Sequence, residues 1–298
     1  MSTRKSKTVS LVLGSGGARG LAHIGIIHWL EENGYQIKAV SGCSMGALIG
    51  GIYAAGKLDD YEHWVRAVTR LDIVTLLDLS WQKTGLVKGD KIISTLIELV
   101  GNRLIEELPI PFTAVASDIE AEKEVWIQSG RLFDAIRASI ALPLFFTPFQ
   151  YRGAYLIDGG ILNPVPIAPT FGDATDITIA INLNGPPLEQ AAPVEVTEQL
   201  SSDVLPFRAN INRFIERLQQ AAKMTNDHDW GAYDIVMQSF EAMQSTIARQ
   251  KLAAYPPDKI IEISRNACAA LEFERAAEMI ELGYRKAEEC LSALKKDD

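Results

Sequence analysis

Apolar and polar residues follow the same order twice in the N-terminal part of the chain. In each copy a short apolar run is followed by glycines and then by a stretch with helical spacing. The first copy predicts a buried strand over Thr8–Leu13 and a helix over Leu21–Glu32 that closes at Gly34. The second copy predicts a strand over Ala39–Ser41 and a small-residue helix that runs to Ala55. A repeated strand, loop and helix is typical of an α/β protein.

The middle of the chain continues this alternation. Its spacing predicts amphipathic helices over Asp59–Thr69 and Lys91–Val100, and strands over Phe112–Ser117, Val125–Gln128 and Ile177–Leu183. Because strands that alternate with helices pair side by side in one direction, we expect a mostly parallel central sheet.

The C-terminal third has a different composition. Residues 184–206 are polar and contain proline, which predicts a surface loop and also fits a lid. We expect one catalytic α/β domain over residues 8–183, the loop or lid over 184–206, and a mostly helical part over 207–298 packed on the same domain. The elements expected in this last part are helices over Phe207–Met224, Tyr233–Leu252 and Ala269–Lys295, and a short strand over Lys259–Ile263.

Composition and charge narrow the function classes. The chain of 298 residues is 47% hydrophobic and 22% charged, as expected for a globular protein with a sizeable core. Its net charge of -9 argues against a nucleic-acid partner, since phosphate binding depends on Lys and Arg. The 3 cysteines show no paired or metal-type spacing, which favours a reducing compartment. Neither a signal-peptide core nor an apolar stretch of about 18 residues is present, so we expect a cytoplasmic protein that touches membranes from one side at most.

The sequence Gly42–Gly46 is a G-x-S-x-G motif between the second predicted strand and its helix. In a nucleophile elbow the central Ser44 sits on a strained turn, and Gly42 and Gly46 let strand and helix approach closely. The helix start also favours negative charge on an attacking oxygen. The alternative is a glycine-rich turn that only packs tightly. Cys43 is a rival nucleophile, which we interpret as a buried small residue because the elbow presents the central position.

The loop Gly14–Gly20 joins the first strand to the first helix. A dinucleotide fingerprint would need glycine where Arg19 stands, and the P-loop lysine is absent, so both nucleotide functions are disfavoured. An oxyanion hole is the other use of such a loop, with donors from the N–H groups of Gly16 and Gly17, joined by that of Met45. Arg19 could orient the loop or hold an anionic head group, or it could pair with a surface carboxylate.

Asp158 is the candidate base for Ser44. It follows the apolar run Tyr155–Ile157 and precedes Gly159 and Gly160, which places it at a strand end facing the cleft. The ordinary pKa of an aspartate is about 3.9, so Asp158 must be partly desolvated to act as a base. A turn or calcium-type aspartate is the structural alternative.

A histidine is the more usual base for a serine nucleophile. The chain has 4 histidines, of which His23, His28 and His63 lie in predicted helices and are interpreted as structural. His228 would complete the chain order Ser, Asp, His of α/β-hydrolases, so a Ser-His-Asp esterase stays open.

Taken together, the three motifs resemble those of the patatin-like phospholipase family, in particular its bacterial single-domain members. The likeness runs over roughly Val9–Ile181. The family's glycine loop corresponds to Ser15–Gly20, its elbow to Gly42–Gly46 and its D-G-A/G motif to Asp158–Gly160. One departure is Ser15, which replaces the first glycine of the loop and is harmless only if its φ is negative.

The resemblance implies a three-layer α/β/α fold and a serine lipid acyl hydrolase. Ser44 would be the nucleophile and Asp158 the proton acceptor of a Ser-Asp dyad that cleaves ester bonds of phospholipids or other acyl lipids, without a metal or cofactor. Substrate would be reached as monomers, micelles or by transient membrane contact. A catalytically silent acyl-lipid-binding or regulatory module is the alternative from another class, and the sequence does not specify the oligomeric state, acyl chain or head group.

Overall fold

The computed structural model describes residues 6–76, 87–187 and 232–292. The chain divides into two compact units, one comprising Met1–Pro187 with Gln244–Asp298 and the other Leu188–Met243. In the second unit the described residues are 232–243, which form the first part of a helix. The first unit carries all three motifs.

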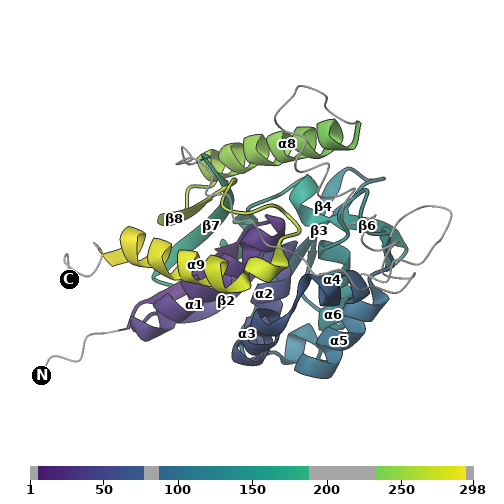
Figure 1. Cartoon of the computed structure of the whole chain (residues 1–298). Helices are drawn as coiled ribbons and strands as arrows, with labels where there is room; N and C mark the ends of the chain where they lie inside the picture. The colour runs from purple at the N-terminus through teal and green to yellow at the C-terminus, as the bar shows by residue number, and fades with distance from the viewer. Residues whose placement is uncertain (1–5, 77–86, 188–231, 293–298) are drawn as a thin grey trace, which may run out of the picture. The chain divides into compact units, whose positions relative to one another are not determined.

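A mixed, mostly parallel sheet forms the centre of this unit (Figure 1). Its strand order is β5-β6-β3-β2-β1-β7-β8, with β4 paired to β3 outside this path. The strands β1, β2, β3, β7 and β8 run parallel to one another, whereas β4, β5 and β6 pair antiparallel. The bounds are β1 Thr8–Leu13, β2 Gln36–Cys43, β3 Phe112–Asp118, β4 Lys123–Ile127, β5 Phe149–Tyr151, β6 Ala154–Asp158, β7 Ile177–Gly185 and β8 Lys259–Ser264.

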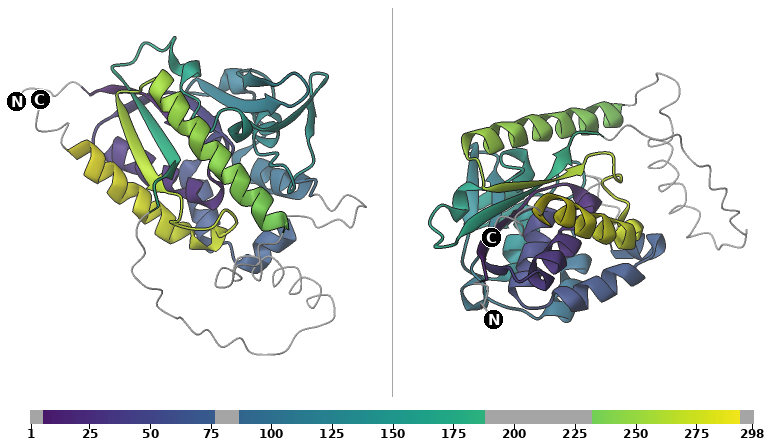
Figure 2. Two further views of the ribbon diagram at one scale, coloured as in Figure 1. Left: turned by 90° about the horizontal axis from the view of Figure 1, so that it is seen from above. Right: turned by 90° about the vertical axis from the view of Figure 1, so that its left-hand side faces the viewer.

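Helices cover this sheet on both faces (Figure 2). Their bounds are α1 Ala22–Glu32, α2 Met45–Ala54, α3 Leu58–Ala67, α4 Arg70–Leu76, α5 Asp90–Val100, α6 Leu132–Ser139, α8 Ala232–Ala254 and α9 Ala276–Leu291. None of the helices in the described ranges is both long and apolar enough to cross a membrane.

The two faces of the sheet bury different cores because side chains alternate along a strand. Leu11 and Leu13 of β1 point into the larger core, together with residues of α1, α2 and α9. Val12 points the other way into a small cluster with Ala180 of β7 and Ala248 of α8. Both faces of β1 and β7 are thus covered, which explains why buried residues follow one another along these two strands. The α/β fold with a mostly parallel sheet is confirmed.

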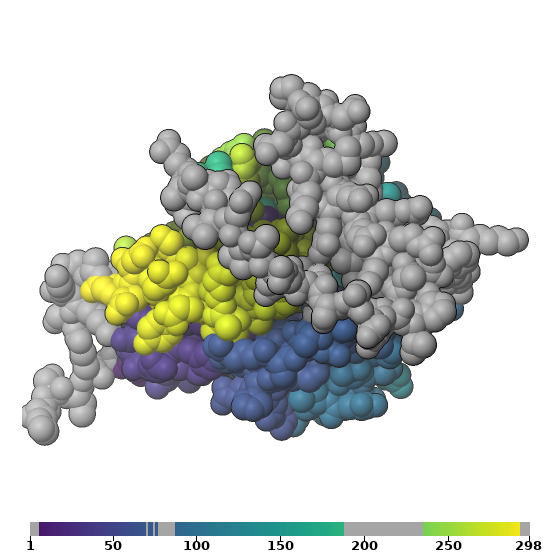
Figure 3. Space-filling view, in the orientation of Figure 1, coloured from purple at the N-terminus to yellow at the C-terminus, as the bar shows by residue number. Residues whose placement is uncertain are grey.

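Helices α1 and α9 lie side by side on the larger core (Figure 3). Glycines permit their close approach: a Cβ on Gly25 would lie 1.9 Å from the Ile280 carbonyl oxygen, and one on Gly283 would lie 2.0 Å from that of Ala22. The C-terminal helix is therefore an integral part of the unit that carries the motifs.

Most of the expected elements in the described ranges are present, but several of their bounds and the number of elements differ from expectation. Helix α9 begins at Ala276 and not at Ala269. The Ala270 carbonyl accepts a hydrogen bond from the Ala18 N–H at 2.8 Å, and this contact holds the segment before Ala276 outside the helix. The short helices α4 and α6 and the short strand β5 were not expected. The expected helix over Phe207–Met224 and nearly all of the expected loop or lid lie outside the described residues.

Candidate active site

Ser44 stands at the junction of β2 and α2, with φ 53° and ψ -125°. This positive φ is rare for a residue with a side chain and is typical of a strained turn. The flanking glycines are required by space, because a Cβ on Gly42 would lie 2.3 Å from the Gly46 carbonyl oxygen and one on Gly46 would lie 2.0 Å from that of Leu13. Strand, turn and helix therefore present the Ser44 side chain from a tightly packed elbow.

Replacing Gly46 with alanine should destabilise the fold. The added methyl meets the backbone of β1, which cannot yield without disturbing the sheet, so we expect a loss of about 1–3 kcal/mol in the free energy of unfolding. Gly172→Ala is the matched control, because a Cβ there has nothing within 4 Å and its φ is not left-handed. Urea unfolding of both variants measures the difference, and an equal stability of the two would contradict the packing of the elbow.

The Ser44 hydroxyl donates a hydrogen bond to the Asp158 carboxylate, with 2.6 Å between Oγ and Oδ2. The other carboxylate oxygen, Oδ1, accepts from the Gly160 N–H at 2.7 Å. Asp158 ends strand β6 beside β3, and a Cβ on Gly159 would lie 2.0 Å from the Val115 carbonyl oxygen. The glycine thus lets the chain turn closely against β3, and the carboxylate lies within proton-transfer distance of the serine.

Burial dominates the electrostatics of this pair. Asp158 is 1% exposed. Desolvation raises the pKa of its carboxyl to about 6, against the lowering effects of the hydrogen bonds from Ser44 and Gly160. A carboxylate with this pKa is ionised at neutral pH and is a much stronger base than a solvated aspartate.

Ser139, at the end of α6, supports the elbow. Its hydroxyl accepts from the Ser44 N–H at 2.9 Å and donates to the Val115 carbonyl at 2.6 Å. The Ser44 N–H is therefore bonded within the fold. No local sequence pattern indicates this contact, because Ser139 lies 95 residues after Ser44.

The glycine loop follows β1 and is tied to three other segments. Gly14 N–H donates to the Ile181 carbonyl at 3.1 Å, Ser15 N–H to that of Pro164 at 2.9 Å, and Ala18 N–H to that of Ala270 at 2.8 Å. The non-glycine residues with positive φ in the described ranges are Ser44, Glu122, Leu144 and Arg152. Ser15 is not among them, so its replacement of the family glycine causes no backbone strain.

The N–H groups of Gly16 and Gly17 lie between these ties, and the hydrogen bonds found among the described residues do not use them. The N–H of Met45, the first residue of α2, is likewise unused there, as expected for a helix start. Two features of position 17 require glycine. Its φ is 56°, and a Cβ there would lie 2.5 Å from the Ala270 carbonyl oxygen. The N–H groups of Gly16, Gly17 and Met45 therefore stay the predicted donors of an oxyanion hole.

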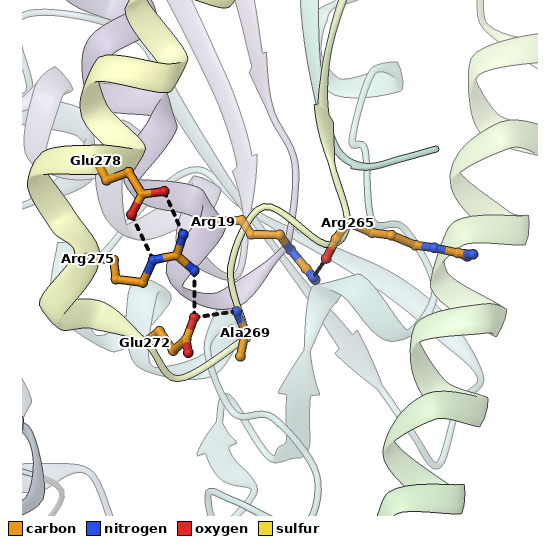
Figure 4. Close-up of polar contacts among 6 residues, drawn as sticks. All are labelled: Arg19, Arg265, Ala269, Glu272, Arg275 and Glu278. Atoms are coloured by element: carbon orange, nitrogen blue, oxygen red, sulfur yellow. Dashed lines mark hydrogen bonds and ion pairs between the residues drawn. The ribbon is translucent and has the colours of Figure 1, made fainter. Parts of the chain in front are cut away.

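Arg19 is 3% exposed and extends from the loop to the segment before α9. Its guanidinium donates through Nη1 to the Arg265 carbonyl (Figure 4). Near it, Arg275 is held between Glu272 and Glu278 (Figure 4). The contact with Arg265 supports the role of Arg19 in orienting the loop.

The alternative nucleophile, Cys43, and the histidines that are alternative bases lie in different surroundings. Cys43 is fully buried, and desolvation together with the Asp158 charge holds the pKa of its thiol well above the usual value, which disfavours a reactive thiolate. His23 is fully buried, with its Nε2 2.9 Å from the Gly14 carbonyl oxygen, and burial lowers its pKa to about 4. His28 pairs with Glu62. His228 lies outside the described residues.

Several known proteins are similar to this chain. The family model for patatin-like phospholipase matches residues 11–171. An uncharacterized NTE family protein of Mycobacterium tuberculosis is 40% identical over 98% of this chain and 94% of its own length. A lysophospholipase NTE1 of Cryptococcus neoformans is 26% identical over 97% of this chain, which spans 17% of that protein. Among solved structures, VipD from Legionella pneumophila aligns with a TM-score of 0.47 and 17% identity over 97% of this chain and 67% of its own. The chain belongs to the patatin-like phospholipase family of carboxylic ester hydrolases.

Proposed function

We propose that the protein hydrolyses carboxylic esters of phospholipids or other acyl lipids with Ser44 as nucleophile and Asp158 as proton acceptor. The observation that carries this proposal is the 2.6 Å hydrogen bond from Ser44 Oγ to a carboxylate whose pKa burial raises to about 6. The serine stands on a strained elbow, where it is presented to a substrate, and the base is already in contact with it.

In the first half-reaction the Ser44 oxygen attacks the ester carbonyl carbon while its proton passes to Asp158 Oδ2. The carbonyl oxygen becomes an oxyanion, which the N–H groups of Gly16, Gly17 and Met45 stabilise. Protonated Asp158 then donates its proton to the leaving alcohol oxygen, and the acyl-enzyme remains on Ser44. No cofactor or metal takes part in this scheme.

In the second half-reaction Asp158 takes a proton from water, and the resulting hydroxide oxygen attacks the acyl-enzyme carbonyl carbon. The tetrahedral intermediate collapses, the bond to Ser44 Oγ breaks, and the proton returns from Asp158 to the serine. The fatty acid leaves and the free dyad is restored, so each proton that Asp158 accepts is given back within a half-reaction.

Fatty-acid release from monoacyl and diacyl phospholipids and from a monoacylglycerol tests this function. Wild type and His228→Gln should both release fatty acid, whereas Ser44→Ala should not. If wild type bound these lipids without cleaving them, a catalytically silent lipid-binding module would replace the proposal. If His228→Gln alone lost activity while folded, a Ser-His-Asp esterase would replace it. The cytoplasmic location and the transient membrane contact stay predictions.

The pH profile should report the dyad carboxyl. Because Asp158 must be ionised to accept a proton, kcat/KM should rise with pH through a midpoint near 6 and level off above it. Below about pH 5 it should fall tenfold per unit of pH. Ester hydrolysis at low substrate concentration, with circular dichroism to show that the fold persists, measures this. A midpoint near 7 that disappears in His228→Gln would contradict the assignment.

A further inference from the structure

The Ser15–Gly16 peptide has a side-chain partner that comes from the far end of β7. The Asn184 amide donates through Nδ2 to the Ser15 carbonyl oxygen at 3.3 Å. Register explains the meeting, since Leu13, the last residue of β1, is opposite Ile181 of β7, and Asn184 follows three residues later in β7. A Cβ on Gly16 would accordingly lie 2.6 Å from the Leu183 Cβ.

This contact fixes the direction of the proposed oxyanion donor. The peptide bond is planar, and no cis peptide occurs in the described ranges, so the Ser15 carbonyl and the Gly16 N–H point in opposite directions from one rigid plane. A hydrogen bond that holds the carbonyl on one side therefore holds the N–H on the other. Asn184 bonds to the carbonyl side of the peptide, and the Gly16 N–H on the opposite side is the group that a substrate oxygen would use.

Asn184 is itself held in place. It is 6% exposed, and its own N–H donates to Asn182 Oδ1 at 3.0 Å. Asn182 in turn donates through Nδ2 to Glu262 Oε1 of β8 at 3.0 Å. The chain of contacts runs from the edge strand through β7 to the glycine loop, so the amide of Asn184 has little freedom to leave Ser15.

The remaining polar groups of Ser15 are also bonded. Its N–H donates to the Pro164 carbonyl at 2.9 Å, and its hydroxyl accepts from Gln244 Nε2 of α8 at 3.4 Å. Three segments thus converge on the residue that precedes Gly16. Of the three contacts, the one from Asn184 is the side-chain contact to the peptide group that carries the Gly16 N–H.

We propose that Asn184 is a positioning residue that aims the Gly16 N–H at the developing oxyanion. The inference rests on the proposed ester hydrolysis. A positioning role differs from that of an ordinary buried amide. Asn184 would stabilise the transition state, in which the carbonyl oxygen carries charge, and would not affect substrate binding.

The test compares Asn184→Ala and the near-isosteric Asn184→Leu, which lacks the amide donor and carries no charge, with Tyr151→Phe. The Tyr151 hydroxyl also donates to a backbone carbonyl, that of Ser129 at 3.1 Å, away from the glycine loop. Loss of a whole oxyanion donor costs about 10²–10³ in kcat, and a misaimed one should cost about 10- to 100-fold. Both Asn184 variants should lose this much in kcat with KM within about 3-fold, and Tyr151→Phe should change neither by more than about 3-fold.

A pair of inhibitors separates aim from packing. A long-chain trifluoromethyl ketone adds to a serine and places an oxyanion in the hole, whereas the matched methylene compound binds without one. Affinity for the ketone should fall in the Asn184 variants by the same factor as kcat/KM, and affinity for the methylene compound should stay that of wild type. Should Asn184→Ala not fold, Asn184→Leu carries the same test.

Unchanged ketone affinity in the Asn184 variants, or an equal loss for both compounds, would overturn the inference while leaving the dyad intact. A wild-type protein that neither cleaves esters nor adds to the ketone would overturn the proposed function, and the inference with it. The wild-type measurement therefore tells the two failures apart.

Discussion

Asp158→Asn should abolish ester hydrolysis and at the same time make the protein more stable. The amide cannot accept the Ser44 proton, so we expect kcat to fall by about 10⁴ or more. The stability gain follows from linkage: burial raises the folded-state pKa of Asp158 from 3.8 to about 6, so the ionised carboxylate disfavours the folded state at neutral pH.

The effect of Asp158 on stability depends on pH. Asp158 contributes its stabilisation while protonated, at pH values below its unfolded pKa, and loses it as pH rises from about 4 to about 6. At pH 7 the Asp158→Asn variant, whose amide carries no charge, should therefore gain about 2 kcal/mol over wild type, a rise of several degrees in Tm. At pH 4 the two proteins should be nearly equal.

Thermal unfolding at pH 4 and pH 7 checks this, with Asp118→Asn as the control. Asp118 is also a buried strand-end carboxylate, but it accepts from the Glu120 and Ala121 N–H groups and does not contact Ser44. Asp118→Asn should keep its activity within a few-fold of wild type. It should gain no stability, because the substitution removes the charge-assisted hydrogen bonds that the carboxylate accepts. A lower Tm for Asp158→Asn at pH 7 would contradict the burial of an ionised base.

Ser44→Ala and Ser44→Gly should both lose activity by about 10⁵ or more, because neither carries a nucleophile. Their stabilities should differ. Position 44 has φ 53° and ψ -125°, a conformation that strains any residue with a Cβ and that glycine adopts freely. Ser44→Gly should therefore be about 1 kcal/mol more stable than Ser44→Ala, although glycine normally lowers stability.

Chemical denaturation of the two variants measures the strain directly. Gly56 provides the reverse comparison, since it has φ 69° with nothing within 4 Å of a Cβ position. Gly56→Ala should lose about 1 kcal/mol from conformation alone. If Ser44→Ala proved as stable as Ser44→Gly, the elbow would not be strained in solution.

Local patterns were sufficient to predict the centre of the fold. Strand β1 was expected with its observed bounds because an apolar run ends sharply at Gly14, and α2 because small apolar residues follow the elbow. Strand β2 is longer than expected, since Gln36 and Lys38 are exposed at its start and interrupt the apolar run. Burial by neighbouring strands, and not local composition, sets where β2 begins.

The supporting contacts of the candidate site could not be predicted in this way. Asn184 meets Ser15 across 169 positions of sequence and Gln244 meets it across 229, so no spacing or local motif connects them. The same holds for Ser139, whose partners depend on how α6 packs on β3. Motifs indicate which groups react, whereas the register of distant strands determines which groups hold them.

The most direct test of the central claim is site-mapped labelling with a fluorophosphonate, read by intact mass and peptide sequencing. Wild type and His228→Gln should each gain one adduct on Ser44, Ser44→Ala should gain none, and Asp158→Asn should react at least about 10³-fold more slowly. An adduct on another residue, or full labelling of Ser44 in Asp158→Asn together with its loss in His228→Gln, would contradict the Ser44–Asp158 dyad.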